Sequence, residues 1–365
     1  MKFLNLFKYF DGPLLLVSGL LMLAGITLMY TTSLANPTLS IFWRQVVFAI
    51  LGTVLLVGMV RYNYHTLAKI NRFTYVVLIL LLIFVLTFGR SIRGSSRWID
   101  LGFFQLQPAE FAKLVVVIGM SRWFYLYRGQ INAWKNVIIT VALAGLPAML
   151  VLAQPDLGSS AVIMAVWFGI LLVSPISKRR MLILVLCGVI AAAAGWQFVL
   201  RDFQRTRLET FINPELDPRG KGYNVRQAII AVGSGELTGR GLGKGLQSQL
   251  RFLPERQTDF IFATASEEIG FVGSVVVVGL YALLLLRILL VARRARDELG
   301  RYLAFGVFFL FFFQISINIA MNIGLAPVTG IPLPLLSYGG SSLLVSFLAL
   351  GMVHNISWQS RALRF

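Results

Sequence analysis

The chain has almost none of the residues from which disulfides and thiolate metal centres are built. It contains one cysteine in 365 residues, and that residue, Cys187, lies inside an apolar run. A single cysteine excludes an internal disulfide and a cysteine metal cluster. The two histidines, His65 and His354, are far apart in the sequence and do not suggest a histidine-based metal site.

Charged residues are also scarce. They make up 13% of the chain, roughly half of what a soluble protein carries, while hydrophobic residues make up 57%. This composition is that of a polytopic helical membrane protein. The net charge of +18 does not indicate a nucleic-acid partner, because basic loops on one side of a membrane explain it. The first apolar run has no clear cleavage site, so we expect a retained span rather than a signal peptide.

A helix needs about 20 mostly apolar residues to span a bilayer. We predict an all-α polytopic membrane protein of about ten transmembrane helices, forming a single domain over residues 1–365. The predicted spans are 13–33, 41–60, 73–89, 110–127, 136–153, 158–175, 181–200, 260–291, 302–322 and 339–357. The fourth is the weakest, because it contains Glu110 and Lys113.

Basic residues are concentrated in alternate connections. The N-terminus, the C-terminal tail and connections 61–72, 122–135, 176–180 and 287–301 together hold 18 Lys and Arg but three acids. Positive charge marks cytoplasmic loops, so both termini are predicted to be cytoplasmic. Of the 15 acids, 12 lie in outer connections or in the outer halves of spans. Chemistry that uses carboxylates is therefore expected on the extracytoplasmic face.

The longest polar stretch, residues 201–258, is a large outer loop between the seventh and eighth spans. It carries ten Lys and Arg and six acids. Arg201, Arg205 and Arg207 are suited to snorkelling at the membrane interface. They are equally suited to holding phosphate, because the guanidinium group matches phosphate geometry.

Inside this loop, residues 224–232 are predicted to form a short helix, and a glycine-rich run over 233–245 follows. The run does not match a P-loop, because Thr238 and Gly245 occupy positions that need glycine and a hydroxyl residue. A flexible loop is the default interpretation, and close approach of its backbone to a ligand is the alternative. Lys244 in this run is a candidate substrate-binding residue.

The second outer connection, residues 90–109, mixes aromatic and polar side chains, as interfacial segments do. Trp98 is expected at headgroup depth. The plain interpretation is an aromatic anchor. The alternative is that Trp98 and Arg97 line a cleft for a lipid headgroup.

Charged residues within or beside the predicted spans are the next candidates. Glu110 and Lys113, at i and i+3, lie on one face of a helix and can pair. Such charges are costly in a membrane, so they face a polar cavity or serve only each other. Asp156 lies at a helix break beside Pro155. It either caps the sixth helix or takes part directly in a site.

Asp259 opens the eighth span, where it or Thr258 can cap the helix. Glu267 and Glu268 follow about two helical turns deeper. Two carboxylates inside an apolar span are expensive unless they line a wet cavity, so we expect them to be functional. Prolines and glycines in residues 322–342 forbid a simple helix, and we predict a re-entrant element beside the site.

Four stretches resemble, in chain order, the motifs of the SEDS proteins (shape, elongation, division and sporulation). They are RGSSRWIDLGFFQLQPAEFAK, QPDLGSS, GYNVRQAIIAVGSGELTGRGLGKGLQSQLRFLPERQTDFIFATASEEIGFVG and NIGLAPVTGIPLPLLSYGGSS. The resemblance covers nearly the whole chain. FQRTR, QSQLRFLPERQTDFIFA and PLPLLSYGG are more similar to the rod-shape branch of the family than to its division branch.

The resemblance implies a peptidoglycan glycosyltransferase of the bacterial cytoplasmic (inner) membrane that polymerises lipid II on the outer face during cell elongation. It implies that Asp259 is the essential aspartate. The other family positions that this sequence matches are Trp98, Glu110, Lys113, Glu267 and Glu268. The implied partners are lipid II, the growing glycan strand, a class B penicillin-binding protein that supplies the transpeptidase, and other membrane proteins of the elongation complex.

Lipid II is an α-linked sugar diphosphate and the glycan product is β-linked. A single inverting displacement needs a base for the acceptor hydroxyl, which is the role expected of Asp259. It also needs positive charge where the diphosphate leaves. The outer-loop arginines, Lys113 or a divalent cation such as Mg²⁺ or Mn²⁺ would supply it, and the sequence does not choose among them.

A lipid II flippase is the main alternative function, because many spans, buried charges and broken helices also describe transporters. The concentration of acids on one face argues against it, as does the lack of an internal sequence repeat. A scaffold that only recruits other wall enzymes is a third interpretation, and it would leave the buried acids unexplained.

Overall fold

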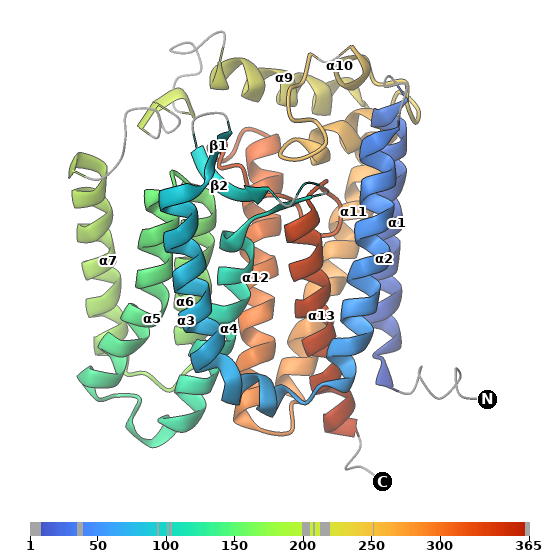
Figure 1. Ribbon diagram of the computed structural model, residues 1–365. Helices are drawn as coiled ribbons and strands as arrows, with labels where there is room; N and C mark the ends of the chain where they lie inside the picture. The colour runs from blue at the N-terminus through green and yellow to red at the C-terminus, as the bar shows by residue number, and fades with distance from the viewer. Residues whose placement is uncertain are drawn as a thin grey trace.

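The computed structural model describes residues 9–34, 39–92, 95–100, 102, 104–198, 205–206, 209–211, 220–250 and 252–361. In this part of the chain, long helices stand side by side in one bundle (Figure 1). Each predicted span coincides with one of them. They are α1 (Gly12–Ser33), α2 (Ser40–Arg61), α3 (Tyr64–Phe88), α4 (Pro108–Leu126), α5 (Trp134–Ala153), α6 (Leu157–Val173), α7 (Lys178–Phe198), α11 (Ile261–Arg293), α12 (Glu298–Asn322) and α13 (Gly340–Arg361).

Eight of these helices are long and apolar enough to cross a membrane. The helix α6 is apolar but shorter, and α4, which carries Glu110 and Lys113, is not among the eight. Helix α3 is longer than predicted, because Asn63 caps it by accepting a hydrogen bond from the His65 N–H. The polytopic helical class is therefore confirmed, while the number of spans stays a prediction.

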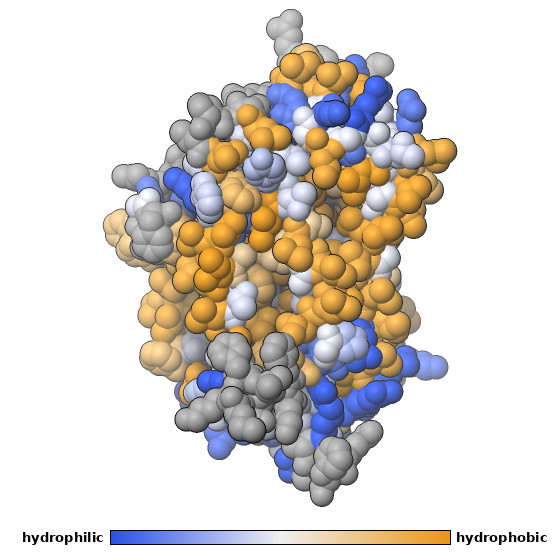
Figure 2. Space-filling view, turned by 90° about the vertical axis from the view of Figure 1, so that its right-hand side faces the viewer, coloured by the Kyte–Doolittle hydropathy of each residue, from blue (hydrophilic) through white to orange (hydrophobic). Residues whose placement is uncertain are grey.

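The helices pack around a continuous apolar core. Helix α13 packs against α2, α12 lies against α4, α6 and α11, and α5 packs on α6. Helix α7 lies at the edge of the bundle, and none of its most apolar stretch is buried (Figure 1). An apolar belt crosses the middle of the surface, between more polar ends (Figure 2). This distribution suits a protein that lies across a bilayer.

The prediction of helices alone missed a small antiparallel sheet in the second outer connection. It has the order β1 (Arg90–Ile92), β2 (Ser95–Asp100), β3 (Gln105–Leu106). The segment that we expected to lie along the membrane interface is therefore a strand. Alternating side chains of a strand point to opposite faces, and this alternation sends neighbouring residues of β2 to different surroundings.

Two shorter helices, α9 (Lys221–Ser234) and α10 (Leu246–Gln249), lie at the end of the bundle that carries the sheet (Figure 1). The predicted helix 224–232 lies within α9. Helix α1 begins and helix α13 ends at the opposite end of the bundle (Figure 1). This arrangement agrees with the prediction that both termini lie on one side of the membrane.

An ion-pair cluster joins the two ends of the chain. Asp11 caps α1 by accepting from the N–H of Leu14, and Arg287 of α11 donates to its carboxylate at 2.8 Å. The hydroxyl of Ser357 in α13 donates to the same carboxylate at 3.2 Å. Burial alone would raise the pKa of Asp11, but the hydrogen bonds from Arg287 and Leu14 hold it below its usual value. The first and last helices are thereby joined.

Candidate active site

Asp259 lies in a non-helical stretch, residues 252–260, that leads into α11, and it is half-buried. Two buried asparagines of α12 hold its backbone: the side-chain amides of Asn318 and Asn322 donate to its carbonyl oxygen at 3.1 and 3.0 Å. Beside the carboxylate is Gly330, where an added Cβ would lie 3.7 Å from Asp259 Oδ2. One side of this carboxylate therefore faces backbone with no side chain.

The predicted cap at the start of α11 was wrong. The helix begins at Ile261 with Phe260 as its N-cap residue, and no side chain of that residue caps it. The Thr258 hydroxyl instead donates to Glu255 at 3.1 Å. The N–H of Ala263 is satisfied from another helix, by the side-chain oxygen of Asn322 at 2.9 Å. The N-cap position of α11 is therefore taken by Phe260, and not by Thr258 or Asp259.

The connection between α12 and α13, residues 323–339, is non-helical, as expected of a re-entrant element, and most of its residues from 331 to 337 are buried. It runs beside the stretch that carries Asp259. Tyr338 donates its backbone N–H to the Gln257 carbonyl at 2.8 Å, and the Ser337 hydroxyl donates to the Thr258 carbonyl at 2.6 Å. Two irregular segments far apart in the sequence therefore support each other around Asp259.

Asp156 is the N-cap of α6, as one of the two interpretations predicted. Its carboxylate accepts hydrogen bonds from the Ser159 N–H and the Ser159 hydroxyl, both at 3.0 Å. It also accepts from the side-chain amide of Gln107 at 3.1 Å, and the Arg97 guanidinium lies 3.7 Å away. Arg97 in turn donates to the carbonyls of Gln154 and Pro155 at the end of α5. Asp156 therefore joins the sheet, α4 and α6.

Glu110 and Lys113 form the predicted ion pair, with 2.5 Å between Glu110 Oε1 and Lys113 Nζ. Both side chains are almost wholly buried, at 3% and 0% exposure. Just before them, the Gln107 N–H donates to the Ser341 hydroxyl at the start of α13 at 2.9 Å. The pair lies at the same end of the bundle as Asp156, since Gln107 bonds to both α13 and Asp156.

The connection 323–339 contacts both groups of polar residues. An added Cβ at Gly158, in the first turn of α6, would lie 2.5 Å from the Thr329 carbonyl oxygen. The next residue, Gly330, lies beside the Asp259 carboxylate, as described above. One short segment of backbone thus separates the Asp156 cap from Asp259. The structure brings these two predicted site residues to opposite sides of the same segment.

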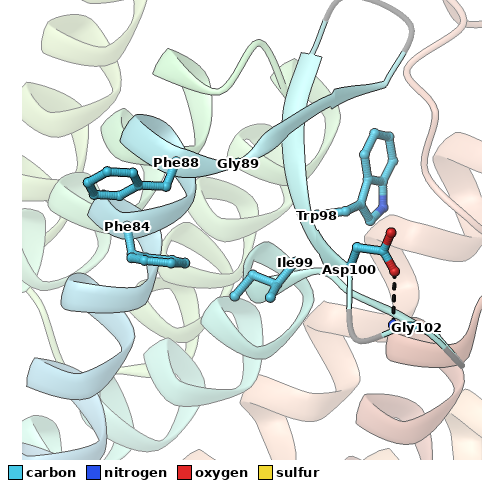
Figure 3. Close-up of a pocket in the computed structure, with 7 residues that line it drawn as sticks. All are labelled: Phe84, Phe88, Gly89, Trp98, Ile99, Asp100 and Gly102. Atoms are coloured by element: carbon cyan, nitrogen blue, oxygen red, sulfur yellow. Dashed lines mark hydrogen bonds between the residues drawn. The ribbon is translucent and has the colours of Figure 1, made fainter.

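Trp98 lines an open pocket of about 430 Å³ between the end of α3 and the strand β2 (Figure 3). Phe84 and Phe88 form its apolar wall, and Asp100 contributes a carboxylate that accepts from the Gly102 N–H at 3.0 Å. Arg97 does not share this pocket, because it points to the break between α5 and α6. The predicted cleft formed by Trp98 and Arg97 together was therefore wrong.

Glu267 and Glu268 are buried, each at 1% exposure, but they lie against the outer loop rather than deeper along the span. Glu267 accepts from the N–H groups of Gln247 and Ser248 at 2.8 and 3.1 Å, and so caps the short helix α10. The carboxylate of Glu268 lies beside Thr31 at the end of α1. The helix breaks just after them, at Gly270, whose φ is 69°.

The glycine-rich run packs against this break. Gly241 donates its N–H to the Glu268 carbonyl at 3.0 Å. A Cβ added at Gly235 or Gly239 would lie 2.0 and 2.3 Å from the carbonyls of Ser266 and Glu268. The close backbone approach that these glycines permit is therefore to the protein's own main chain. A flexible loop was the wrong default interpretation.

The predicted phosphate-binding residues do not gather at one place in the described structure. Lys244 is exposed on the glycine-rich run. Arg205 donates to the Gln197 carbonyl at 2.8 Å, at the end of α7. Arg201 and Arg207 lie outside the described residues. Lys113 is paired with Glu110.

Sequence analysis missed four residues that build the site. They are Gln107, Arg256, Asn318 and Asn322. Arg256 is buried and donates to the carbonyls of Ser248 and Thr32, so it fixes the outer stretch before Asp259 to α1. A signal was present for the asparagines, because two amides one turn apart in an apolar helix need partners when buried.

Comparisons with known proteins agree with this architecture. The family model of the FtsW, RodA and SpoVE cell cycle proteins matches residues 8–362. The peptidoglycan glycosyltransferase MrdB of Escherichia coli strain K12 is 37% identical over 349 residues, which cover 95% of this chain and 93% of MrdB. The peptidoglycan glycosyltransferase RodA of Treponema pallidum is 32% identical, with 95% of this chain and 97% of RodA covered.

Solved structures give the same result. A chain from a study of the structural coordination of polymerization and crosslinking by a peptidoglycan synthase complex superposes with a TM-score of 0.81 at 29% identity, covering 96% of this chain and 98% of that one. The crystal structure of the rod shape determining protein RodA of Thermus thermophilus gives a TM-score of 0.71 at 28% identity, covering 95% and 96%. The expected resemblance is confirmed, and the chain belongs to the FtsW, RodA and SpoVE family, the SEDS proteins.

Proposed function

We propose that this protein is a peptidoglycan glycosyltransferase that polymerises lipid II into glycan strands during cell elongation. Family membership and the names of the relatives support the enzyme class. The observation that carries the mechanism is the setting of Asp259: a half-buried carboxylate on a hydrogen-bonded backbone, beside Gly330. Such a carboxylate is fixed in place and approachable, as a general base must be.

The reaction that we assign to Asp259 is a single inverting displacement. The acceptor hydroxyl oxygen attacks the anomeric carbon of the donor sugar while its proton passes to the Asp259 carboxylate. The bond from that carbon to the diphosphate oxygen breaks, and the diphosphate leaves with the bonding electrons. One base and one displacement convert the α-linkage of the donor into the β-linkage of the product.

The leaving diphosphate needs positive charge. Lys244 and Arg205 are our candidates among the described residues, with Arg201 and Arg207 from the same loop. A divalent cation, Mg²⁺ or Mn²⁺, would supply the same charge. In the described residues no three His, Cys, Asp or Glu side chains form a metal-binding group. A cation would be held by diphosphate oxygens together with a carboxylate, which is a common arrangement for Mg²⁺.

The pocket beside Trp98 offers a surface for the lipid-linked sugar. Its apolar wall of Phe84 and Phe88 suits the lipid. The indole ring of Trp98 and the Asp100 carboxylate point to the other side of β2 from these rings, and they suit the polar head (Figure 3). Glu110, Lys113, Asp156, Glu267 and Glu268 complete the predicted substrate-binding set. In this proposal Asp156 and Glu267 act by holding the helices and loops around the substrate, since both are caps.

Alanine at Gly330 is expected to lower polymerisation at least tenfold, because its methyl group would lie in van der Waals contact with Asp259 Oδ2 and obstruct the approach of the acceptor hydroxyl to the carboxylate. Gly324 is the matched control: it has a φ of 76°, close to the 74° of Gly330, but an added Cβ meets the flexible side chain of Ile229. Both substitutions carry similar backbone strain. Equal losses of polymerisation for Gly330→Ala and Gly324→Ala in a glycan-length assay would show that the absence of a side chain at Gly330 is not needed for access to the Asp259 carboxylate.

We place the active site on the extracytoplasmic face of the bacterial inner membrane. A cysteine at Lys244 is then expected to react with a membrane-impermeant reagent in intact spheroplasts, and a cysteine at Arg294 is not. The native Cys187 is exposed on α7 and is first replaced by serine to give a clean background. Labelling of the residue 294 variant but not of the residue 244 variant would reverse the orientation and reject the external site.

The proposed partner is a class B penicillin-binding protein that crosslinks the new strands. The solved complex that resembles this chain couples polymerization to crosslinking, according to its description. Other membrane proteins of the elongation complex are further proposed partners. The surface in Figure 2 has a broad apolar belt on which a partner's transmembrane helix can pack.

One experiment separates polymerase from flippase. Purified protein is given lipid II alone, and the products are separated on a glycan-length gel. A polymerase gives a ladder of glycan strands. Translocation of lipid II in liposomes without any ladder would favour the flippase, and neither activity from an otherwise folded protein would favour the scaffold.

A further inference from the structure

Two asparagines interrupt the apolar helix α12 one turn apart. Asn318 and Asn322 are both completely buried, at 0% exposure. Burying an amide is costly unless its hydrogen bonds are made. Their positions near the C-terminal end of α12 bring both amides to the stretch that carries Asp259.

The hydrogen bonds of these asparagines run to the main chain on both sides of the Asp259 carboxylate. Asn318 Nδ2 donates to the carbonyl of Asp259 at 3.1 Å and to that of Ile331 at 2.7 Å. Asn322 Nδ2 donates to the Asp259 carbonyl at 3.0 Å. The Asp259 carbonyl therefore accepts hydrogen bonds from two side-chain amides. The amide of Asn318 also donates to Ile331, the residue after Gly330.

Asn322 also caps the N-terminus of α11 from the neighbouring helix α12. Its Oδ1 accepts the backbone N–H of Ala263 at 2.9 Å, in the first turn of α11. The first N–H groups of a helix have no partner within it, and Phe260 provides no side-chain cap here. The direction in which α11 leaves Asp259 is therefore set by α12.

We propose that Asn318 and Asn322 are positioning residues that hold the Asp259 carboxylate where the acceptor hydroxyl arrives. They bind the Asp259 backbone and the Gly330 segment to one helix, and so set the position of the base relative to the neighbouring backbone. This inference rests on the proposed function in one respect, that Asp259 is the base. A misplacement of about 1 Å in such a site lowers a rate by about 10²-fold.

Serine substitutions test the proposal with little risk to folding. A serine in a helix can donate to the carbonyl four residues earlier, as Ser266 and Ser346 do in this protein. It is too short to reach Asp259 from α12. Asn355→Ser is the matched control, because Asn355 is a buried asparagine of α13 that donates to the Val60 carbonyl at 2.5 Å, at the end of the bundle near the chain termini.

The full-length protein in liposomes is given lipid II, and melting temperature, kcat and KM are measured. Asn318→Ser and Asn322→Ser are expected to lower kcat at least tenfold with KM within threefold, while Asn355→Ser keeps kcat within threefold. Similar falls in melting temperature for all three would show that stability does not explain the difference. Asp259→Glu displaces the carboxylate itself. The double variant of Asp259→Glu and Asn318→Ser is expected to lose less kcat than the product of the two single-variant losses.

Two results would overturn the proposal. One is a kcat for Asn318→Ser and Asn322→Ser equal to that of Asn355→Ser. The other is a loss of kcat in the Asp259→Glu and Asn318→Ser double variant that equals the product of the two single-variant losses. Failure of the proposed function has a different signature. If the protein is no polymerase, the wild type gives no glycan ladder, and if Asp259 is not the base, an Asp259→Asn enzyme polymerises normally whatever the asparagine variants do.

Discussion

Asparagine in place of Asp259 is expected to lower the rate of lipid II polymerisation by about 10²–10⁴-fold, the usual cost of losing a general base. The substitution keeps the size of the side chain and leaves the backbone carbonyl that Asn318 and Asn322 hold. Folding, and the binding of lipid II, should therefore survive. The measurement is a glycan ladder from purified protein, beside a binding assay with the same lipid.

Glu236→Gln is the control, because Glu236 is an exposed carboxylate of the same outer loop. It is expected to polymerise at the normal rate. Asp259→Ser distinguishes chemistry from a local structural role, since serine keeps a hydrogen-bonding group but is no base. An active Asp259→Ser or Asp259→Asn enzyme would show that another residue is the general base. Glu267 would be the next candidate, although its hydrogen bonds to α10 oppose such a role.

Loss of one partner of the Glu110–Lys113 pair is expected to be nearly as damaging. Either Glu110→Gln or Lys113→Met leaves an uncompensated charge where both side chains are buried. Breaking such a pair costs about 3–5 kcal/mol, enough to unfold many proteins. Thermal unfolding and polymerisation are measured for both variants, and both quantities are expected to fall.

The double variant of Glu110 and Lys113 decides whether this ion pair is purely structural or also binds substrate. With Glu110→Gln and Lys113→Met together, no lone charge remains, so stability should largely return. We expect polymerisation to stay absent, because we assign the pair to substrate binding. The matched control is Asp11→Asn with Arg287→Met, a pair near the chain termini that is expected to keep most activity. Recovered polymerisation in the Glu110–Lys113 double variant would make that pair purely structural.

The helices of this protein could be predicted from the sequence, because each follows from local composition. An apolar run of about 20 residues has few alternatives to a membrane helix. The Glu110–Lys113 pair and the Asp156 cap also depend on neighbours three residues away, which helical geometry fixes. These predictions needed no knowledge of how the helices pack.

The features that could not be predicted depend on contacts between distant segments. Glu267 was expected to line a wet cavity, yet it caps α10 through residues that lie about 20 positions earlier. The strand that carries Trp98 has only short partners, so its alternation was masked by a mixture of aromatic and polar residues. Asn318 offered no hint of its partners, because both carbonyls come from irregular segments whose paths only the fold defines.

The pairing of the two irregular segments has a consequence for how the enzyme is made. The stretch before α11 obtains its hydrogen bonds from Ser337 and Tyr338, which precede the last helix of the described chain. Ribosomes deliver the helices in order, and the earlier ones enter the membrane first. A nascent chain that has reached only α12 already carries the asparagines that bind the Asp259 carbonyl, but it lacks the hydrogen bonds that Ser337 and Tyr338 make to the two preceding residues. We therefore expect polymerisation only after the segment before α13 has been synthesised. A translation product arrested at α12 and left in the membrane should be inactive.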